Sequence, residues 1–489
     1  MRLTDLRNLC LMALVAAATL GAAEKDASLA TAAKNRDVGR VRTLLNQQVD
    51  VNLPDAHGTT ALHWMAQWND AEIVALLIKR GAHVDAANRY GATPLWVAAG
   101  LGNAAAVKQL LGAGASPNKA ALSGEPPLVS AALSGSAETV RALLAKGADA
   151  NAAESWRGQT ALMMAVGKFV PSPDVTKVLI EYKADVKIRS SGGMTALLFA
   201  VRQNDIESVR LLIDAGANVD DEAKGQMSAL RIAIDNGHYK LAHLLLDKGA
   251  NVNAPDGNGF TPIYAAIRAR AGGSEEFGAT DAVADGELTM SVLRALIARG
   301  ADVNVTLPPV KLPPNFNPDG YPQTNNVQYA GATPFWVASV LADLEVMRLL
   351  VGVGANPRAA SMEKTTPLMV AAGLGYGTRG PTSRLGGRRL DTQEAVVAVV
   401  KQLIEWGNDV SAANDKGQTA LHGAVASAAP PVAQLLLDHG APLNQKDEIG
   451  RTPFIMADEH RTDKYRTNQS LDPKGIVATY ELLRAKNAP

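Results

Sequence analysis

The stretch Thr-Ala-Leu-His at residues 60–63 decides the fold, because close variants of it return about every 33 residues. The copies begin with Thr, Ser or Pro, continue with Ala or Pro, and have an apolar third residue. They are TALH (60–63), TPLW (93–96), PPLV (126–129), TALM (160–163), TALL (195–198), SALR (228–231), TPIY (261–264), TPFW (333–336), TPLM (366–369), TALH (419–422) and TPFI (452–455). A fixed period of this size is typical of a solenoid, in which each unit packs only on its neighbours. The repetition therefore predicts a binding scaffold, and it does not say what is bound.

Residues 193–220 show what one repeated unit contains. Thr195 is a good N-cap for a first helix, and an apolar run follows it as far as the break at Asn204-Asp205. Apolar residues at helical spacing over 209–213 then predict a second helix. Gly216 stands just past its end, where a left-handed residue is least costly. The Asp/Asn-x-x-Gly stretches between units carry turn residues, so one unit is a helix, a turn, a helix and a projecting hairpin.

The repeated pattern resembles the ankyrin repeat family. The shared features are Gly-x-Thr-Pro-Leu-His-x-Ala-Ala, a Val-x-x-Leu-Leu helix and Gly-Ala-x-Val-Asn, over roughly residues 28–460. The resemblance implies an all-α solenoid of about twelve stacked helix-turn-helix units with projecting β-hairpins and a cap at each end. The tetrapeptide His is kept only at His63 and His422, so we expect weaker polar bracing between units. Trp96 and Trp336, which replace this His, are expected to be structural.

The N-terminus differs from the repeats. Arg2 and Arg7 precede an apolar stretch at Leu9–Leu20, and Gly21-Ala22-Ala23 supplies the small residues of a cleavage site. This pattern predicts a signal peptide over residues 1–23; a retained helix or membrane anchor is the alternative. Cys10 is the only cysteine, so a cleaved chain contains no disulfide. We therefore expect an exported protein of the bacterial type, periplasmic or secreted, with no membrane insertion after cleavage.

The remainder of the chain divides into caps, repeats and insertions. Residues 24–56 lack the tetrapeptide but keep a second-helix pattern, so we assign them to an N-terminal capping repeat. Ankyrin repeats are predicted for 57–449, and a capping repeat with a terminal helix for 450–489. Insertions interrupt the period at 272–287, 306–329 and 373–391.

The insertions are the parts that the repeat does not explain. Residues 272–287 are acidic and residues 373–391 are basic, so they either face each other or are solvated loops with incidental charge. Residues 306–329 are rich in proline, which favours an extended, stiff arm. Phe316 and Tyr321 in this arm are candidate contact residues.

No motif for catalysis, a cofactor or a metal stands out. The sequence contains no His-Glu-x-x-His, no Gly-x-Ser-x-Gly and no P-loop. Gly375–Gly380 matches Gly-x-Gly-x-x-Gly, but it follows a predicted short helix rather than a strand, so we do not expect a dinucleotide site. The balance of 48 Lys+Arg against 48 Asp+Glu disfavours nucleic acid. We predict a protein that is not an enzyme.

The resemblance also implies where a partner binds, since ankyrin proteins use their hairpin tips and the inner face of the first helices. Trp, Tyr and Arg at such places dominate interface energies. The matching tip residues are Arg89, Tyr90, Trp156, Arg157 and Phe260. The matching first-helix residues are Trp68, Arg202, Gln203, Ile267 and Arg268.

We therefore predict a monomeric, non-enzymatic scaffold that binds a protein partner in the groove that these residues line. One alternative is an accessory or inhibitory subunit of one exported enzyme, which would use the proline-rich insertion 306–329. Another is an enzyme whose site lies in the insertions.

Overall fold

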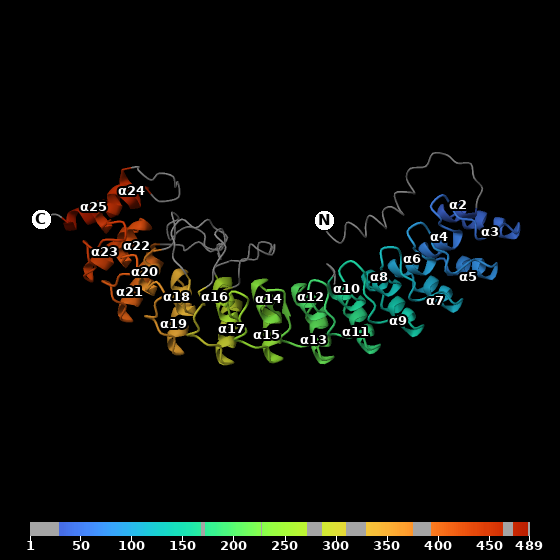
Figure 1. Cartoon of the computed structure of the whole chain (residues 1–489), viewed down its shortest axis with the longest axis horizontal. Coiled ribbons are helices and arrows are strands. Elements are labelled where there is room, and N and C mark those ends of the chain that lie inside the picture. Colours follow the sequence, from blue (N-terminus) through green and yellow to red (C-terminus); the bar gives the residue numbers. More distant parts are fainter. Residues whose placement is uncertain are drawn as a thin grey trace. The chain divides into compact units, whose positions relative to one another are not determined.

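The computed structural model describes residues 29–167, 172–225, 227–270, 286–309, 329–374, 393–462 and 473–487. Within these ranges the chain forms 24 helices, the first and second helices of twelve pairs, and almost no strand. They belong to two compact units, Met1–Lys224 and Gly225–Pro489. Each unit is a stack of helix pairs (Figure 1), which confirms the all-α solenoid prediction.

In the first unit the helices alternate between two rows. Each first helix packs against its own second helix and against the first helix of the next pair. The first helices are α2 (Leu29–Lys34), α4 (Ala61–Gln67), α6 (Pro94–Gly100), α8 (Pro127–Ser134), α10 (Ala161–Gly167) and α12 (Ala196–Arg202). The second helices are α3 (Val38–Asn46), α5 (Ala71–Lys79), α7 (Ala104–Gly112), α9 (Ala137–Ala145), α11 (Pro173–Glu181) and α13 (Ile206–Asp214). The two-residue strand β1 (Glu222–Ala223) follows them.

The second unit repeats this arrangement after the two-residue strand β2 (Met227–Ser228). Its first helices are α14 (Ala229–Asp235), α16 (Pro262–Arg270), α18 (Pro334–Val340), α20 (Pro367–Ala371), α22 (Ala420–Ala426) and α24 (Pro453–Arg461). Its second helices are α15 (Tyr239–Asp247), α17 (Gly286–Ala298), α19 (Leu344–Gly352), α21 (Gln393–Glu405), α23 (Pro430–Asp438) and α25 (Pro473–Asn487). Because α25 packs on both α24 and α23, it takes the place of the second helix in the last pair.

Local chemistry explains where these helices begin and end. The Thr93 hydroxyl accepts a hydrogen bond from the Trp96 backbone N–H at 3.1 Å and so caps α6. The Asp70 carboxylate accepts from the Ile73 N–H at 3.0 Å and caps α5. Each such cap stabilises its helix by about 1 kcal/mol. After α13 the chain turns at Gly216, whose φ of 94° is accessible to glycine at little cost.

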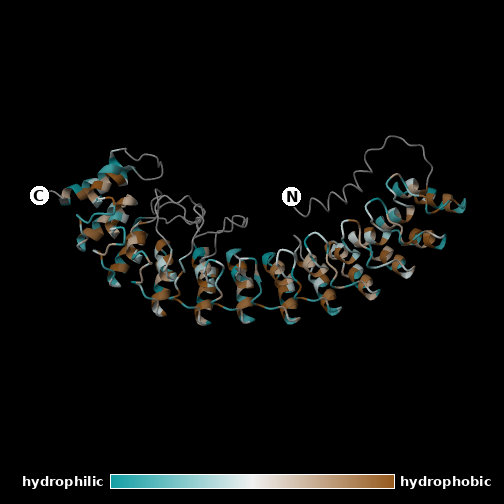
Figure 2. Ribbon diagram, in the orientation of Figure 1, coloured by the Kyte–Doolittle hydropathy of each residue, from teal (hydrophilic) through white to brown (hydrophobic). Residues whose placement is uncertain are grey.

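The core lies between the two rows of helices. Leu62, Leu95, Val74 and Leu77 are completely buried. Each buried Leu or Val stabilises the stack by roughly 1.5–3 kcal/mol, and much of that burial comes from the neighbouring pair. Hydrophobic residues concentrate in the helices of both units, whereas the turns are more hydrophilic (Figure 2).

The insertions leave the repeats at defined points. Residues 271–285 separate α16 from α17, and residues 372–392 separate α20 from α21. On either side of residues 310–328, the Leu307 N–H donates to the Ala332 carbonyl at 3.0 Å, and the Leu307 carbonyl accepts from the Gly331 N–H at 2.8 Å. These bonds close the base of this hairpin.

The predicted signal peptide and the central part of the arm, including Phe316 and Tyr321, lie outside the described residues. So does the Gly-x-Gly-x-x-Gly sequence at 375–380. Among the described helices, none combines the length and the apolar character that crossing a bilayer demands.

Candidate protein-binding surface

The hairpin tips are held by side-chain oxygens that accept backbone N–H groups of the same turn. The Asn88 side-chain oxygen accepts from Tyr90 at 2.9 Å and from Ala92 at 3.1 Å. The longer Glu154 carboxylate does the same in its own tip, accepting from the Trp156 N–H at 2.6 Å. Such turns hold the backbone in one conformation, so the tip side chains start from fixed positions.

Neighbouring tips are also joined to one another. The Leu122 N–H donates to the Tyr90 carbonyl at 2.9 Å, which links the tips of the second and third hairpins. The Ser155 hydroxyl donates to the Ser123 carbonyl at 2.9 Å and links the third tip to the fourth. The three tips therefore form one continuous row within the first unit.

Four of the predicted contact residues lie on these tips. Tyr90 is 45% exposed and Trp156 is 56% exposed. The Arg157 guanidinium lies over the Trp156 ring, 4.2 Å from its centroid. Arg89 is exposed beside Tyr90. The structure thus brings together the aromatic and cationic side chains that the sequence selected separately.

Phe260 and Ile267 do not lie on the surface. Phe260 is 8% exposed and meets Tyr264 edge to face with 5.7 Å between ring centroids, whereas Ile267 is completely buried. Ile267 was expected at a helix end, but α16 runs on to Arg270 and keeps it inside the helix. The predicted contact role of these two residues is therefore corrected to a core role. Arg268 is half-buried, with its guanidinium 5.8 Å from the Phe260 ring.

The remaining predicted residues lie at the ends of first helices in the first unit. The Trp68 indole N–H donates to the Ala33 carbonyl at 3.1 Å, so this half-buried ring packs on the preceding helix pair. The Gln203 side chain donates to the Gly167 carbonyl at 3.3 Å in the same manner. Arg202 is exposed. Trp68 and Gln203 thus hold adjacent pairs together, and Arg202 remains available to a partner.

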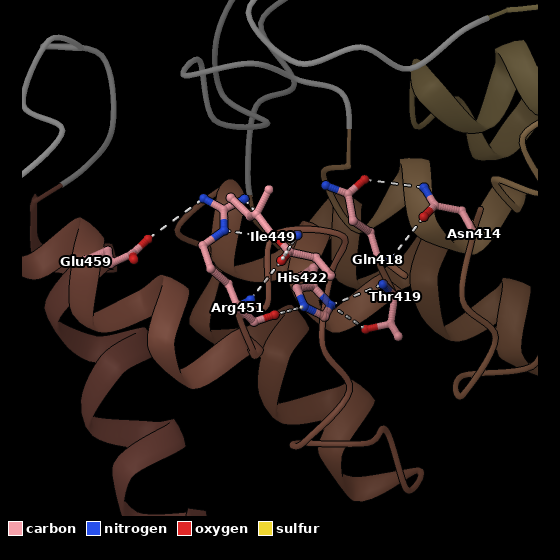
Figure 3. Close-up of polar contacts among 8 residues, drawn as sticks. Asn414, Gln418, Thr419, His422, Ile449, Arg451 and Glu459 are labelled. Carbon is pink, nitrogen blue, oxygen red and sulfur yellow. Dashed lines mark hydrogen bonds and ion pairs between the residues drawn. The ribbon is translucent and has the colours of Figure 1, made fainter. Parts of the chain in front are cut away.

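The fourth tetrapeptide residue braces consecutive units. His63 Nε2 lies 3.0 Å from the Ala92 carbonyl oxygen, immediately before the next tetrapeptide. His422 Nε2 lies 3.2 Å from the equivalent carbonyl of Arg451, and Thr419 donates its N–H to the other ring nitrogen at 3.1 Å (Figure 3). Each histidine therefore connects the cap of its own helix to the following hairpin.

Other side chains make the same bond where His is replaced. The Trp96 indole N–H donates to the Glu125 carbonyl at 3.0 Å. Arg231, Tyr264 and Trp336 donate to the equivalent carbonyls of their following hairpins at 3.1, 2.8 and 2.9 Å. The expectation of weaker bracing is wrong at these four positions, because any long side chain with an N–H or O–H donor reaches the carbonyl. The structural role predicted for Trp96 and Trp336 is confirmed.

Comparison with known families decides the identity of the repeat. The family described as "Ankyrin repeats (3 copies)" matches residues 29–121, 102–190 and 169–256, and the family described as "Ankyrin repeat" matches residues 416–448. Together these matches cover more than half of the chain. The chain belongs to the ankyrin repeat family.

Individual relatives share only part of this ankyrin chain. Potassium channel AKT1 of Oryza sativa subsp. indica is 37% identical over 71 residues, which is 14% of this chain and 8% of the channel. Human "Ankyrin repeat and SOCS box protein 16" is 31% identical over 157 residues, 28% of this chain and 35% of that protein. This chain thus spans much less than two thirds of either relative. The crystal structure of the human ASB11 ankyrin repeat domain is 25% identical, with a TM-score of 0.40, over 49% of this chain and 96% of that domain.

Burial changes the protonation of the ankyrin histidines. It lowers the pKa of His63 to about 4, although the bond to the Ala92 carbonyl opposes this shift. Because Thr60 donates its N–H to His63 Nδ1 at 3.2 Å, the neutral ring carries its proton on Nε2. Burial likewise lowers the pKa of His422. These side chains are neutral hydrogen-bonding braces at pH 7.

The charged groups of the second unit are arranged as structural pairs. Arg231 bonds Asp235 at 2.7 Å and Asp256 at 3.1 Å, and Arg270 bonds Asp343 at 2.6 Å. Within the described ranges, no group of three or more His, Cys, Asp or Glu side chains is placed to hold a metal ion. What the ankyrin tips offer instead is a rigid surface of aromatic, apolar and cationic side chains.

Sequence reasoning missed one prominent tip residue, Leu122, which is 79% exposed. It stands two residues before Gly124, as Arg89 stands two residues before Gly91. The rule that selects Arg89 therefore also selects Leu122. The signal was present in the repeat register, but a Leu in the short tip Ala-Leu-Ser-Gly was not considered as a contact.

Proposed function

We propose that the protein is a non-enzymatic scaffold that binds a protein partner through the hairpin tips of its first unit. The observation that supports this most directly is that Tyr90 and Trp156, two large aromatic side chains, are about half exposed on hydrogen-bonded tips. Large rings on a rigid support lose little side-chain entropy when they are buried, and aromatic residues commonly dominate binding energy. Ankyrin repeats generally mediate protein–protein interaction, which supports the same function.

A photo-crosslinking amino acid tests this proposal. Tyr90→p-benzoylphenylalanine places the crosslinker on the tips, and Glu207→p-benzoylphenylalanine on the exposed side of α13 is the matched control. Both full-length variants would be illuminated in extracts of the source cells, and adducts identified by mass spectrometry. A discrete, saturable adduct from position 90 that is absent from position 207 supports the scaffold. Equal or absent adducts from both positions contradict it.

A narrower form of this function is an accessory or inhibitory subunit of one exported enzyme. The closed hairpin base at Leu307, Gly331 and Ala332 makes this form testable, because residues 310–328 can be replaced there without opening the hairpin. The test replaces residues 310–328 with a short Gly-Ser linker. If the position-90 adduct is one enzyme, its activity should change when the full chain is added and not when the shortened chain is added. Equal effects of both chains exclude a role of the arm.

We also propose that the protein is exported, which rests on the sequence of residues 1–23 alone. Amino-terminal sequencing of the mature protein from fractionated cells tests this. A mature chain that begins at Glu24 and is recovered outside the cytoplasm supports export. An intact N-terminus in the cytoplasmic fraction contradicts it.

A further inference from the structure

Three successive hairpin tips of the first unit present large apolar side chains. They are Tyr90, Leu122 and Trp156, which we call the tip row. The tips on either side present polar residues instead, His57 before the row and Ser191 after it. A single exposed apolar residue is ordinary, but an adjacent set with polar limits marks an interaction site.

The spacing of the tip row restricts the conformation of what binds. First helices of adjacent units pack about 8–10 Å apart, so successive tips recur at about that interval. Leu122 and Trp156 stand two residues before the glycine of their tips, and Tyr90 stands one residue before its glycine. A polyproline II segment advances about 3.1 Å per residue and repeats every three residues, so every third side chain points to the same side at an interval of about 9 Å. A β-strand does not match, because its side chains alternate between two faces and every third one points away. An α-helix advances about 1.5 Å per residue and would need a spacing of about five to seven residues.

The tip backbone does not offer a free edge for strand pairing. The Tyr90 carbonyl accepts from the Leu122 N–H, and the Ser123 carbonyl accepts from the Ser155 hydroxyl. A strand that paired along these tips would have to replace these bonds, so we expect side chains to make most of the contacts. This favours a polyproline II segment, because that conformation makes no backbone ladder and repeats every three residues.

The charge around the tip row selects an acidic segment. The Arg157 guanidinium carbon lies 4.2 Å from the centroid of the Trp156 ring, and a guanidinium in such a contact can bind a carboxylate through its N–H groups. Arg89 adds a second exposed cation at the Tyr90 end. Two carboxylates belong to these tips: Glu154 is buried and accepts backbone N–H groups of its own tip, and Glu125, half-buried beside the Leu122 tip, accepts from the Ser130 hydroxyl. A partner with carboxylates near both ends of the row complements these charges.

We propose that the tip row binds an extended, acidic segment of a protein partner, with apolar side chains at every third position and a carboxylate that meets Arg157. This inference rests on the proposed scaffold function and specifies its ligand. Arg157 selects charge, while Leu122, the most exposed of the three apolar residues, contributes apolar contact at the centre of the row.

Selection from random peptides tests the proposal without knowledge of the partner. Phage-displayed twelve-residue peptides would be selected on the full chain and depleted on the Tyr90→Ser, Leu122→Ser, Trp156→Ser triple variant. We expect the enriched peptides to share apolar residues three apart with flanking Asp or Glu. A synthetic peptide of that consensus should bind the full chain in fluorescence anisotropy.

Single variants then locate the site. Leu122→Ser should lower the affinity for the synthetic peptide at least about tenfold. Arg157→Glu should also lower the affinity, and it should make the affinity less dependent on salt concentration. Met362→Ser, at a 60% exposed tip residue of the second unit, is the matched control and should leave affinity unchanged. Leu122 and Met362 are exposed and Arg157 is half-buried, so none of the substitutions opens the core, and an unchanged thermal midpoint verifies that each variant is folded.

The outcomes separate this inference from the scaffold function. A consensus with the helical spacing of about five to seven residues, a consensus without acidic residues, or binding that Leu122→Ser leaves intact would each overturn the inference. If no peptide is enriched while position 90 still crosslinks a partner, the inference is wrong and the scaffold stands. If no peptide is enriched and position 90 gives no specific adduct, both the inference and the proposed scaffold function are wrong.

Discussion

The indole N–H of Trp336 donates a 2.9 Å hydrogen bond to the carbonyl oxygen of Thr365, the residue directly before the next tetrapeptide. His63 and Ala92 have the same relationship at the same separation of 29 residues. Two chemically different side chains thus form a hydrogen bond with the equivalent carbonyl, that of the residue before the next tetrapeptide. The acceptor of this brace between units is the same in both repeats, whereas the donor side chain differs.

Tyr264→Phe should destabilise the second unit by about 1–2 kcal/mol. The Tyr264 hydroxyl lies 2.8 Å from the carbonyl oxygens of both Val305 and Ala332 and has one proton to donate to them. Its removal leaves these acceptors without this donor while the side-chain volume hardly changes. The measurement is urea denaturation followed by circular dichroism. Tyr182→Phe is the control, because the Tyr182 hydroxyl makes no hydrogen bond within the described ranges, and its midpoint should not move. Equal midpoints for wild type and Tyr264→Phe would show that the brace contributes nothing.

Acidification should remove stability through His63. Its pKa is about 4 in the folded protein and about 6.5 when unfolded, so the neutral folded form is favoured. This contribution is fully present above pH 6.5 and is lost as the pH falls from 6.5 toward 4, up to about 3 kcal/mol. His63→Gln should be less stable than wild type at pH 7.5 but should lose less stability between pH 7.5 and 4.5. Urea midpoints at the two pH values measure this, and parallel losses in both proteins would contradict it.

Gly423→Ala should destabilise the second unit by about 1–3 kcal/mol. An added Cβ would lie 2.7 Å from the Leu374 backbone N and 3.0 Å from the Met369 carbonyl oxygen, so backbone rather than a flexible side chain would have to move. Gly352→Ala is the matched control, because nothing lies within 4 Å of its added Cβ at the end of α19. The control should be neutral or stabilising by up to about 1 kcal/mol. Thermal midpoints that shift in the same direction would refute the packing argument.

Arg270→Leu should cost about 3–5 kcal/mol, the usual effect of leaving one partner of a buried ion pair alone. The Arg270 side chain is 4% exposed and bonds Asp343 at 2.6 Å, Glu345 at 2.9 Å and the Gly286 carbonyl at 2.8 Å. The last bond joins the two sides of the first insertion, so hydrogen exchange in α17 should also accelerate.

Arg294→Leu is the control for this ion pair. Arg294 is 56% exposed and lies 3.7 Å from Glu345, so its removal should change stability by less than about 1 kcal/mol. Similar losses in both arginine variants would mean that burial of the pair is unimportant.

The repeat register could be predicted because its signals are local. Thr93 and Thr195 cap helices with their own hydroxyls, and Gly216 ends a helix by its own φ. Each signal acts within a few residues, so periodicity and cap chemistry were enough to predict the helix pairs and the resemblance to the family.

The surface could be predicted only in part. Tyr90 and Trp156 are exposed as expected, whereas Phe260, chosen by a similar rule, is buried against Tyr264. The difference depends on side-chain orientation at the end of each hairpin, which the tetrapeptide register does not specify. Leu122 shows the opposite case, since the repeat register indicates it as a tip residue, two residues before Gly124, and the structure adds that its tip is joined to that of Tyr90.

The sequence by itself determined the period, the order of the helix pairs and the fold class, because these follow from interactions between residues close along the chain. Only the tertiary structure decided that Trp96, Arg231, Tyr264 and Trp336 act as the histidines do, and that Tyr90, Leu122 and Trp156 form one row. The physical reason is distance along the chain. A hydrogen bond to a carbonyl in the next unit, or contact between successive tips, exists only after neighbouring repeats have packed.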